Sequence, residues 1–268
     1  MGLLKRKNSK KSKVIKSTVD KTRIIDKYAP FMIQETYKSL RTNLMFAMQS
    51  DGEGGKVIVF TSAIPSEGKT TVCINTAITF AQTGAKVMII DSDLRIPKLH
   101  KYFDIDGKVG LSNVLGGFVN CADVITHVEK YNIDCIPGGH IPPNPAELLS
   151  SKAMEDTLSE LKSKYDYIFI DTPPVTIVTD AVSIAPHACG VALVVREKYT
   201  PHAAVSDVLK TFRFANIKVL GIIDNCSKAS DASYGGRYGA KRLFSYRSHY
   251  YKYGGGYYGY GAKSLEEK

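Results

Sequence analysis

Short runs of Val, Ile and Phe alternate along the chain with longer segments whose apolar residues recur every three or four positions. The short runs predict strands over 56–61, 86–91, 132–136, 166–171, 190–196 and 217–224. The longer segments predict helices over 69–83, 111–116, 145–163, 179–187 and 201–215. This alternation indicates an α/β fold, a mostly parallel sheet covered by helices on both faces. Such sheets bind their ligands at the carboxyl ends of the strands.

A further helix is predicted over 31–49, ahead of the first strand. Its apolar residues fall on one face, at Ile33, Tyr37, Leu40, Leu44 and Met48. Glu35, Lys38 and Arg41 lie three residues apart on another side of the same helix. They form either ordinary pairs between neighbouring turns or an interaction face.

The first strand of the alternating region leads into residues 62–71, Ser-Ala-Ile-Pro-Ser-Glu-Gly-Lys-Thr-Thr, and a helix follows directly. A strand, a tight loop ending in Gly-Lys-Thr and a helix are typical of a phosphate-binding loop. Backbone N–H groups at a helix start attract phosphate, because they lack intrahelical partners and carry the positive end of the dipole. The motif usually begins with glycine, where this chain has Ala63. The simpler alternative is an ordinary strand-to-helix turn.

Six residues of this loop are predicted to bind a nucleotide: Ser66, Glu67, Gly68, Lys69, Thr70 and Thr71. Gly68 allows the backbone to approach the phosphates closely. Lys69 would reach the β- and γ-phosphates, and the hydroxyl of Thr70 would bind Mg²⁺.

Carboxylates follow two other predicted strands. Asp91 and Asp93 stand at the end of strand 86–91, and Asp171 ends strand 166–171 in a Walker B pattern. Carboxylates next to buried strands are costly unless positive charge lies nearby, and a magnesium-bound nucleotide would supply it. Each motif alone could be an exposed polar loop. Their occurrence at the ends of three strands favours one shared nucleotide site.

The last predicted strand ends at Asn225, where a side chain could read the edge of a nucleotide base. Capping of the strand is the alternative. The stretch 142–149, Pro-Pro-Asn-Pro-Ala-Glu-Leu-Leu, opens a predicted helix, and proline is common near helix starts.

The net charge of +10 is concentrated at the two ends of the chain. Residues 1–27 carry a net charge of +8 and residues 228–268 a net charge of +5, so the remainder is slightly acidic. This distribution argues against nucleic acid as a partner, because such proteins carry their positive charge on a folded face. The basic segment 1–27 is predicted to be a disordered tail, either simply solvated or attracted to an anionic membrane or acidic partner.

Apolar runs and cysteines predict the cellular compartment. No run approaches the ~18 residues needed to cross a bilayer, and the first residues lack the apolar core of a signal peptide. The five cysteines are scattered without a paired motif, which suits a reducing compartment. A cytoplasmic protein is therefore expected.

Nine of the sixteen tyrosines lie within residues 228–268, among Gly, Ser, Lys and Arg. The glycines predict a flexible segment without a packed core. It could be a low-complexity tail, a stacking surface for single-stranded nucleic acid, or a set of phosphate acceptors. A nucleotide site on the same chain favours acceptors. The predicted organisation is thus a tail over 1–27, a nucleotide-binding domain over 28–227 and an acceptor tail over 228–268.

Together, these residues resemble the bacterial tyrosine kinases of capsule and exopolysaccharide synthesis, the BY-kinase family, in its stand-alone cytoplasmic type. The resemblance covers the chain from about residue 25 to its end. It depends on the loop 62–71, on Asp91-x-Asp93-x-Arg95 (the family's Walker A′ motif) and on the strand ending at Asp171. The stretch 142–149 and the tyrosine cluster complete it.

The resemblance implies a P-loop NTPase fold of the MinD/ParA type and an ATP-dependent protein-tyrosine autokinase that regulates polysaccharide synthesis and export. It implies four catalytic residues: Lys69, Asp91, Asp93 and Asp171. Among these, Asp93 and Asp171 would hold Mg²⁺ with Thr70, and Asp91 would accept or direct the tyrosine proton. Arg95 would contact a phosphate of the nucleotide or brace its own loop.

The implied acceptors belong to the C-terminal cluster and are used mainly between neighbouring subunits: Tyr246, Tyr250, Tyr251, Tyr253, Tyr257, Tyr258 and Tyr260. The family builds a ring oligomer with a Glu-x-x-Arg-x-x-Arg motif, which here reads Glu35-x-x-Lys38-x-x-Arg41. Lysine keeps the charge but lacks the planar fork of arginine. Because the charge pattern of the motif is kept, a ring of unphosphorylated subunits is expected.

The resemblance also implies external partners. They are a separate transmembrane adaptor of the polysaccharide chain-length regulator type, which would recruit the chain to the inner face of the membrane, and a phosphotyrosine phosphatase. The main alternative is a MinD/ParA-like ATPase whose tyrosine tail binds a partner. Those ATPases carry a signature lysine five residues before the loop lysine, where this chain has Ile64.

Overall fold

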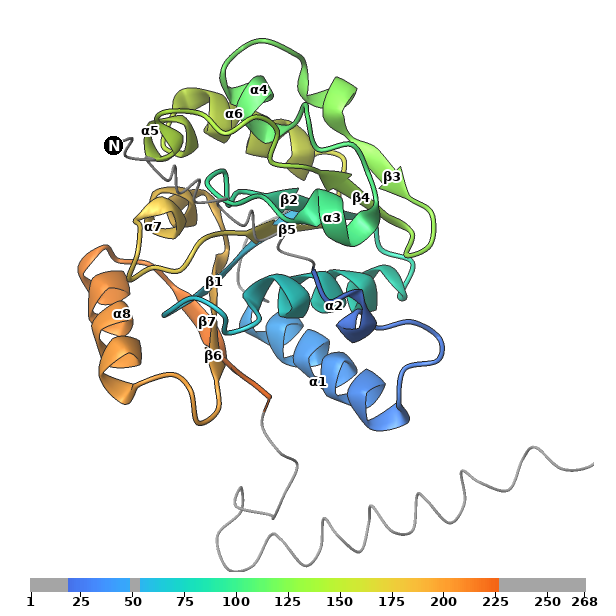
Figure 1. Cartoon of the computed structure of the whole chain (residues 1–268), viewed down its shortest axis with the longest axis vertical. Helices are drawn as coiled ribbons and strands as arrows, with labels where there is room; N and C mark the ends of the chain where they lie inside the picture. The colour runs from blue at the N-terminus through green and yellow to red at the C-terminus, as the bar shows by residue number, and fades with distance from the viewer. Residues whose placement is uncertain (1–18, 49–53, 227–268) are drawn as a thin grey trace, which may run out of the picture. The chain divides into compact units, whose positions relative to one another are not determined.

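The computed structural model describes residues 19–48 and 54–226, which contain one seven-stranded sheet (Figure 1). Its strands are β1 (Lys56–Ser62), β2 (Val87–Asp91), β3 (Thr126–Val128), β4 (Ile133–Ile136), β5 (Tyr167–Asp171), β6 (Gly190–Arg196) and β7 (Val219–Asn225). Their order across the sheet is β3-β4-β2-β5-β1-β6-β7. All neighbours pair in parallel except β3 and β4, which confirms the mostly parallel sheet.

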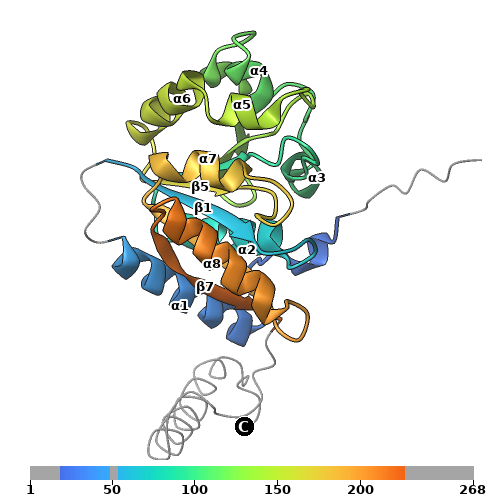
Figure 2. The same cartoon turned by 90° about the vertical axis from the view of Figure 1, so that its left-hand side faces the viewer.

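Helices cover both faces of this sheet (Figures 1 and 2). The helices are α1 (Phe31–Ala47), α2 (Lys69–Ala81), α3 (Leu99–Phe103), α4 (Leu111–Leu115), α5 (Pro145–Leu149), α6 (Lys152–Lys162), α7 (Asp180–Ile184) and α8 (His202–Phe214). Helices α1 and α2 pack on one face, and α6, α7 and α8 pack on the other. Within the described ranges, no helix combines the length and apolar character that a membrane crossing requires.

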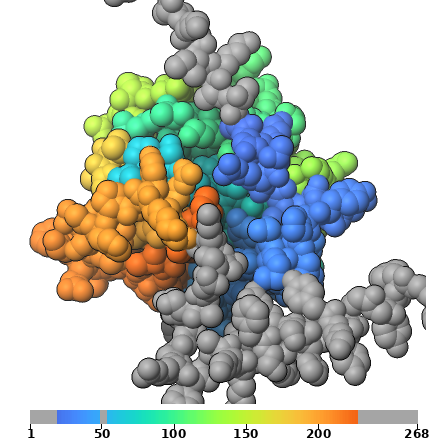
Figure 3. All heavy atoms as spheres, turned by 60° about the horizontal axis from the view of Figure 1, so that its bottom comes forward, coloured from blue at the N-terminus to red at the C-terminus, as the bar shows by residue number. Residues whose placement is uncertain are grey.

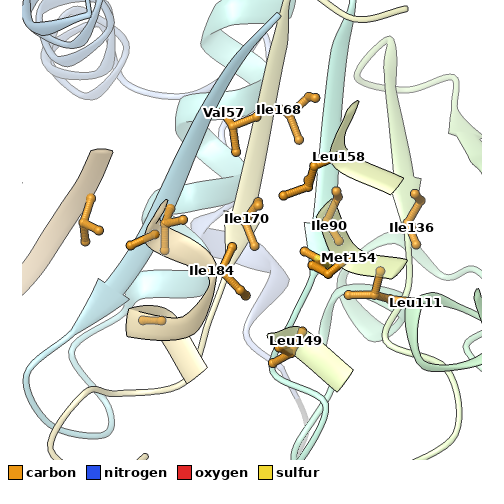
Figure 4. Packing of buried hydrophobic residues seen from close by; sticks show 14 of the residues in the cluster. Val57, Ile90, Leu111, Ile136, Leu149, Met154, Leu158, Ile168, Ile170 and Ile184 are labelled. Carbon is orange, nitrogen blue, oxygen red and sulfur yellow. The ribbon is translucent and has the colours of Figure 1, made fainter. Parts of the chain in front are cut away.

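The strand residues alternate between two cores, as the period of a strand requires. In β1, Val57 and Val59 point to the α6–α8 side, while Ile58 and Phe60 point to α2. Figure 4 shows the first core, where the side chains of β5 and β2 lie against those of α6. Each central strand is therefore apolar on both faces, which explains the uninterrupted apolar runs in the sequence.

The structure departs from the predicted elements in two places. Strand β3 and helix α3, at three and five residues, are too short to show a period in the sequence and were not predicted. The helix predicted over 145–163 is two helices, α5 and α6. It breaks at two serines, because the hydroxyls of Ser150 and Ser151 donate to the carbonyls of Glu147 and Leu148 and compete with the helical backbone.

The end of the predicted N-terminal tail belongs to the folded unit, which corrects the predicted boundary at residue 27. Ile24 and Ile25 are only 8% and 4% exposed and join the core on the α2 side. Asn75 of α2 binds this segment at both ends: its Oδ1 accepts from the Ile25 N–H and its Nδ2 donates to the Arg23 carbonyl. Residues 228–268, the predicted acceptor tail, lie outside the described residues.

Candidate active site

The strand order brings the three predicted motifs to one edge of the sheet. Strand β5 lies between β1 and β2 and pairs with both. In this register Asp171 is the direct neighbour of Asp91 on one side and of Phe60 on the other. Residues 62–71, here called the phosphate loop, continue from β1 at the same edge.

The phosphate loop has the backbone of an anion-binding turn. Ser66 and Gly68 adopt left-handed conformations, with φ of 67° and 85°, and Gly68 caps the start of α2. A turn that combines left-handed with right-handed residues can direct its N–H groups toward one point, where a phosphate can be bound. A Cβ atom at Gly68 would also collide with the side-chain amide of Asn225. Glycine is therefore required here for two reasons.

Lys69, the first residue of α2, points into a cluster of carboxylates. Its Nζ lies 3.1 Å from Asp171 Oδ1 and 3.7 Å from Asp93 Oδ2. The hydroxyl of Thr70 donates to Asp171 Oδ2 over 2.7 Å. The predicted catalytic lysine thus contacts two of the predicted acidic residues. The side chains of these three residues and of Thr70 are all buried.

Burial shifts the protonation of this cluster. It raises the pKa of Asp91 to about 7, and the charge of Asp171 adds to the effect. Burial also raises the pKa of Asp171, although Lys69 and Thr70 oppose it. For Lys69, burial alone would lower the pKa, but the carboxylates of Asp171 and Asp93 outweigh it and the pKa is raised. One buried cation thus faces three carboxylates.

This excess of negative charge fits a bound Mg²⁺ ion. Thr70, Asp93 and Asp171 carry the oxygen ligands that would hold Mg²⁺. In the part of the chain that the structure describes, no group of three or more His, Cys, Asp or Glu side chains could hold a metal ion alone. Protein sites for Mg²⁺ commonly use one or two carboxylates together with phosphate oxygens and water, which matches this donor set.

Asp91 is fully buried at the end of β2. Its Oδ2 accepts hydrogen bonds from the N–H groups of Lys98 and Leu99, at 2.7 and 2.8 Å. Its Oδ1 accepts one longer bond, 3.3 Å, from the Asp93 N–H. The carboxylate therefore organises the loop from β2 to α3, and Oδ1 is the oxygen with remaining acceptor capacity.

Two predicted nucleotide-binding residues face the protein rather than the site. The carboxylate of Glu67 is buried and accepts bonds from the Ile64 N–H and the Thr200 hydroxyl. Asn225 Nδ2 donates to the Glu67 carbonyl over 2.8 Å, and its Oδ1 accepts from the Cys226 N–H. Asn225 thus both supports the phosphate loop and caps β7.

The other two predicted residues of the loop, Ser66 and Thr71, contact neighbouring elements. The side chain of Ser66 is exposed, and its backbone carbonyl accepts from Arg196 over 3.4 Å. The Thr71 hydroxyl lies 3.4 Å from the Tyr102 hydroxyl of α3.

Arg95 pairs with Asp180, a contact that can brace the loop after β2. Its guanidinium contacts both carboxylate oxygens of Asp180, each over 3.3 Å. Asp180 is fully buried at the first turn of α7, where the helix dipole also favours a negative charge. Asp180 was not predicted as a site residue, because an aspartate at the start of a helix is an ordinary helix-start signal. The pair joins the loop after β2 to the segment after β5.

The residues predicted for oligomerisation lie on α1. Lys38 pairs with Glu35 over 2.8 Å on the partly exposed surface. Arg41 donates to the carbonyl of Thr79 in α2, over 2.8 Å. The two residues of the pair are accessible to a neighbouring subunit, whereas Arg41 also holds α1 against α2.

The fold and this site define a P-loop nucleotide-binding protein, and a family model described as "AAA domain" matches residues 55–218. Curated relatives include the tyrosine-protein kinase YwqD of Bacillus subtilis, 39% identical over 78% of this chain and 88% of the relative. The tyrosine-protein kinase CpsD of Streptococcus agalactiae is 33% identical over 78% and 90% of the two chains. The chain belongs to the bacterial tyrosine-protein kinase family.

Solved structures agree with this family. The kinase domain of the Escherichia coli tyrosine kinase ETK superposes with a TM-score of 0.69 and 34% identity, over 75% of this chain and 80% of that one. The septum site-determining protein MinD of Pyrococcus horikoshii has a TM-score of 0.54 and 25% identity, over 63% and 69% of the two chains. Some relatives are much longer: the chain covers 28% of the putative tyrosine-protein kinase EpsB of Ralstonia nicotianae.

Proposed function

We propose that this chain is an ATP- and Mg²⁺-dependent protein-tyrosine kinase. It transfers the γ-phosphoryl group to its own C-terminal tyrosines, mainly between neighbouring subunits, and regulates capsule or exopolysaccharide synthesis and export. The observation that carries this proposal is the contact of Lys69 with Asp171 and Asp93 at the end of the phosphate loop. Membership in the tyrosine-protein kinase family supports the choice of tyrosine as acceptor.

Catalysis in this proposal is mainly positioning and charge neutralisation, because phosphoryl transfer passes through a loose transition state. The N–H groups of the phosphate loop and the ammonium of Lys69 bind the phosphates. Thr70, Asp93 and Asp171 hold Mg²⁺, which when bound neutralises phosphate charge. Arg95 and Asp180 keep the loop after β2 in place.

Asp91 is proposed to accept or direct the proton of the acceptor hydroxyl. A tyrosine has an ordinary pKa of about 10 and needs a proton acceptor at neutral pH. Asp91 Oδ1 has acceptor capacity left, and a carboxyl whose pKa is about 7 is matched to this task.

The decisive experiment follows labelled phosphate. The full chain is incubated with ATP labelled at the γ-phosphate and Mg²⁺, then digested and the peptides are sequenced. We expect label on tyrosines of the C-terminal cluster, among them the seven proposed acceptors from Tyr246 to Tyr260. Release of free phosphate without phosphotyrosine would instead support the MinD/ParA-like ATPase with a partner-binding tail.

The proposed oligomer is a ring of unphosphorylated subunits that use Glu35, Lys38 and Arg41. The tail carries a net charge of +5, and each phosphate adds about −1.5 to −2, so about three phosphates cancel the charge of one tail. Further phosphates make neighbouring tails repel one another. We expect sedimentation to show assemblies before incubation with Mg·ATP and smaller species afterwards. An unchanged size at full phosphorylation would contradict this.

The proposed partners follow from the family resemblance. A separate transmembrane adaptor of the polysaccharide chain-length regulator type recruits the chain to the inner face of the membrane and completes the active site. A phosphotyrosine phosphatase reverses the modification.

A further inference from the structure

The phosphate loop contains a buried carboxylate that does not face the nucleotide. Glu67 is 1% exposed, and its side chain turns back under the loop. Its Oε2 accepts a hydrogen bond of 2.7 Å from the N–H of Ile64, three residues earlier in the same loop. Its Oε1 accepts from the hydroxyl of Thr200, which belongs to a segment more than 130 residues away. A buried carboxylate is stable only while such donors are present.

Thr200 lies in the turn between β6 and α8, and its hydroxyl is held by the sheet. That hydroxyl accepts a hydrogen bond of 2.8 Å from the N–H of Arg196, the last residue of β6. The Thr200 N–H donates in turn to the Arg196 carbonyl, over 3.0 Å. Because a hydroxyl has only one proton, the bond accepted from Arg196 leaves that proton for Glu67.

Two further bonds hold the carbonyls of the phosphate loop from the same side. Asn225 Nδ2 donates to the Glu67 carbonyl, and Arg196 Nη1 donates to the Ser66 carbonyl. The Glu197 N–H donates to the Asn225 carbonyl over 3.0 Å and so connects the two supports. Figure 3 shows orange atoms of the region around α8 beside cyan atoms of the region around the phosphate loop.

These bonds determine where the N–H groups of the loop point. In a trans peptide the C=O and the following N–H point in opposite directions. Holding the carbonyls of Ser66 and Glu67 toward Arg196 and Asn225 therefore aims the N–H groups of Glu67 and Gly68 away from those two residues. Contacts with the carbonyls of the loop therefore hold its backbone in a phosphate-binding conformation.

We propose that Glu67 and Thr200 are positioning residues for nucleotide binding, and that with Arg196 and Asn225 they form a loop clamp. The clamp acts through the backbone of the phosphate loop, without touching the nucleotide. This inference rests on the proposed function only in that the site binds a magnesium–nucleotide.

The test is the affinity of the full chain for Mg·ADP, measured by calorimetry, in a matched set of threonine variants. Thr200→Val keeps the shape but removes the hydroxyl, and we expect Kd to rise about tenfold, as for the loss of one hydrogen bond to a charged group. Thr200→Ser keeps the hydroxyl and should stay within about twofold of the original chain. Thr211→Val is the control, because that exposed hydroxyl bonds the Asp207 carbonyl of its own helix.

A double-mutant cycle separates a clamp from general loosening of the fold. Glu67→Gln removes the negative charge that accepts the hydrogen bond of the Thr200 hydroxyl. We therefore expect the Thr200→Val/Glu67→Gln double variant to have about the same Kd for Mg·ADP as the single variant with the higher Kd. In kinase assays the KM for ATP should rise while kcat stays within about threefold, because the clamp sets the binding site and not the chemical step.

Several outcomes would overturn the clamp. They are unchanged Mg·ADP affinity in Thr200→Val and Glu67→Gln, strictly additive losses in the double variant, or an equal loss in Thr200→Ser. Thermal unfolding identifies any variant that is not folded. If Thr200→Val is not folded, Glu67→Gln decides: a rise in Kd with an unchanged kcat supports the clamp, and an unchanged Kd overturns it. Absence of Mg·ADP binding by the original chain would instead overturn the proposed function.

Discussion

Replacement of Lys69 by methionine is expected to lower kcat/KM for phosphotyrosine formation by about 10³-fold or more. Methionine fills a similar volume but leaves the phosphates without the cation that α2 presents to them. In the structure this ammonium is the partner of Asp171 and Asp93, so the substitution also disturbs the groups proposed to hold Mg²⁺. Antibody detection of phosphotyrosine on purified chain, at saturating Mg·ATP, measures the effect.

The same substitution should destabilise the fold in the absence of Mg²⁺. It leaves three buried carboxylates without a cation, a type of change that commonly costs about 3–5 kcal/mol. Because burial raises the pKa of Asp91 to about 7, the folded chain binds that proton more tightly than the unfolded chain does. The loss of stability should therefore be largest above pH 7 and shrink as the pH is lowered toward about 4, near the ordinary carboxyl pKa.

Lys210→Met provides the matched control for Lys69→Met. Lys210 lies on α8, where its side chain is 72% exposed and pairs with Asp207 of the same helix. That variant should keep both phosphotyrosine formation and thermal stability. Undiminished phosphotyrosine in Lys69→Met would contradict the proposed active site as a whole.

The second large effect is expected for Asp171→Asn, which should lower kcat by about 10²-fold or more. Asparagine can still accept a hydrogen bond from Thr70 or Lys69, but it cannot offer two anionic oxygens to Mg²⁺. The KM for Mg²⁺ should rise together with the loss of kcat. A titration of activity with Mg²⁺ at fixed ATP measures both quantities.

The stability of Asp171→Asn should move differently from that of Lys69→Met. Burial raises the pKa of Asp171, so removal of its charge removes an unfavourable term and also relieves the repulsion of Asp91. Thermal unfolding should show little change or a gain in stability. Asp207→Asn, at a side chain that is 68% exposed, is the control and should affect neither quantity. A fully active Asp171→Asn variant would exclude this residue from the proposed site.

Much of the fold could be predicted, because the central strands are apolar on both faces and the helices that cover them are amphipathic. Each predicted strand is present with its ends within two residues. The short elements β3 and α3 could not be predicted, since three to five residues do not establish a period. The burial of Ile24 and Ile25 was also missed, because the surrounding lysines made the segment look like a solvated tail.

The candidate site was partly predictable for a similar reason. Parallel strands place their carboxyl ends at one edge, so a loop and two carboxylates that follow strands must face the same edge. The sequence by itself thus determined which residues make up the candidate site: Lys69, Thr70, Asp91, Asp93 and Asp171. It also determined the class of fold and the family.

Only the tertiary structure decided which of these residues meet and what supports them. The insertion of β5 between β1 and β2 makes Asp171 the neighbour of both Asp91 and the phosphate loop. The partners of Arg95 and Glu67 are Asp180 and Thr200, which lie 85 and 133 residues away. Local periodicity and spacing carry no information about such contacts, because strand order and long-range packing arise from the burial of the whole core at once. For that reason the residue types of the site could be predicted from the sequence, while the long-range contacts that hold them in place could not.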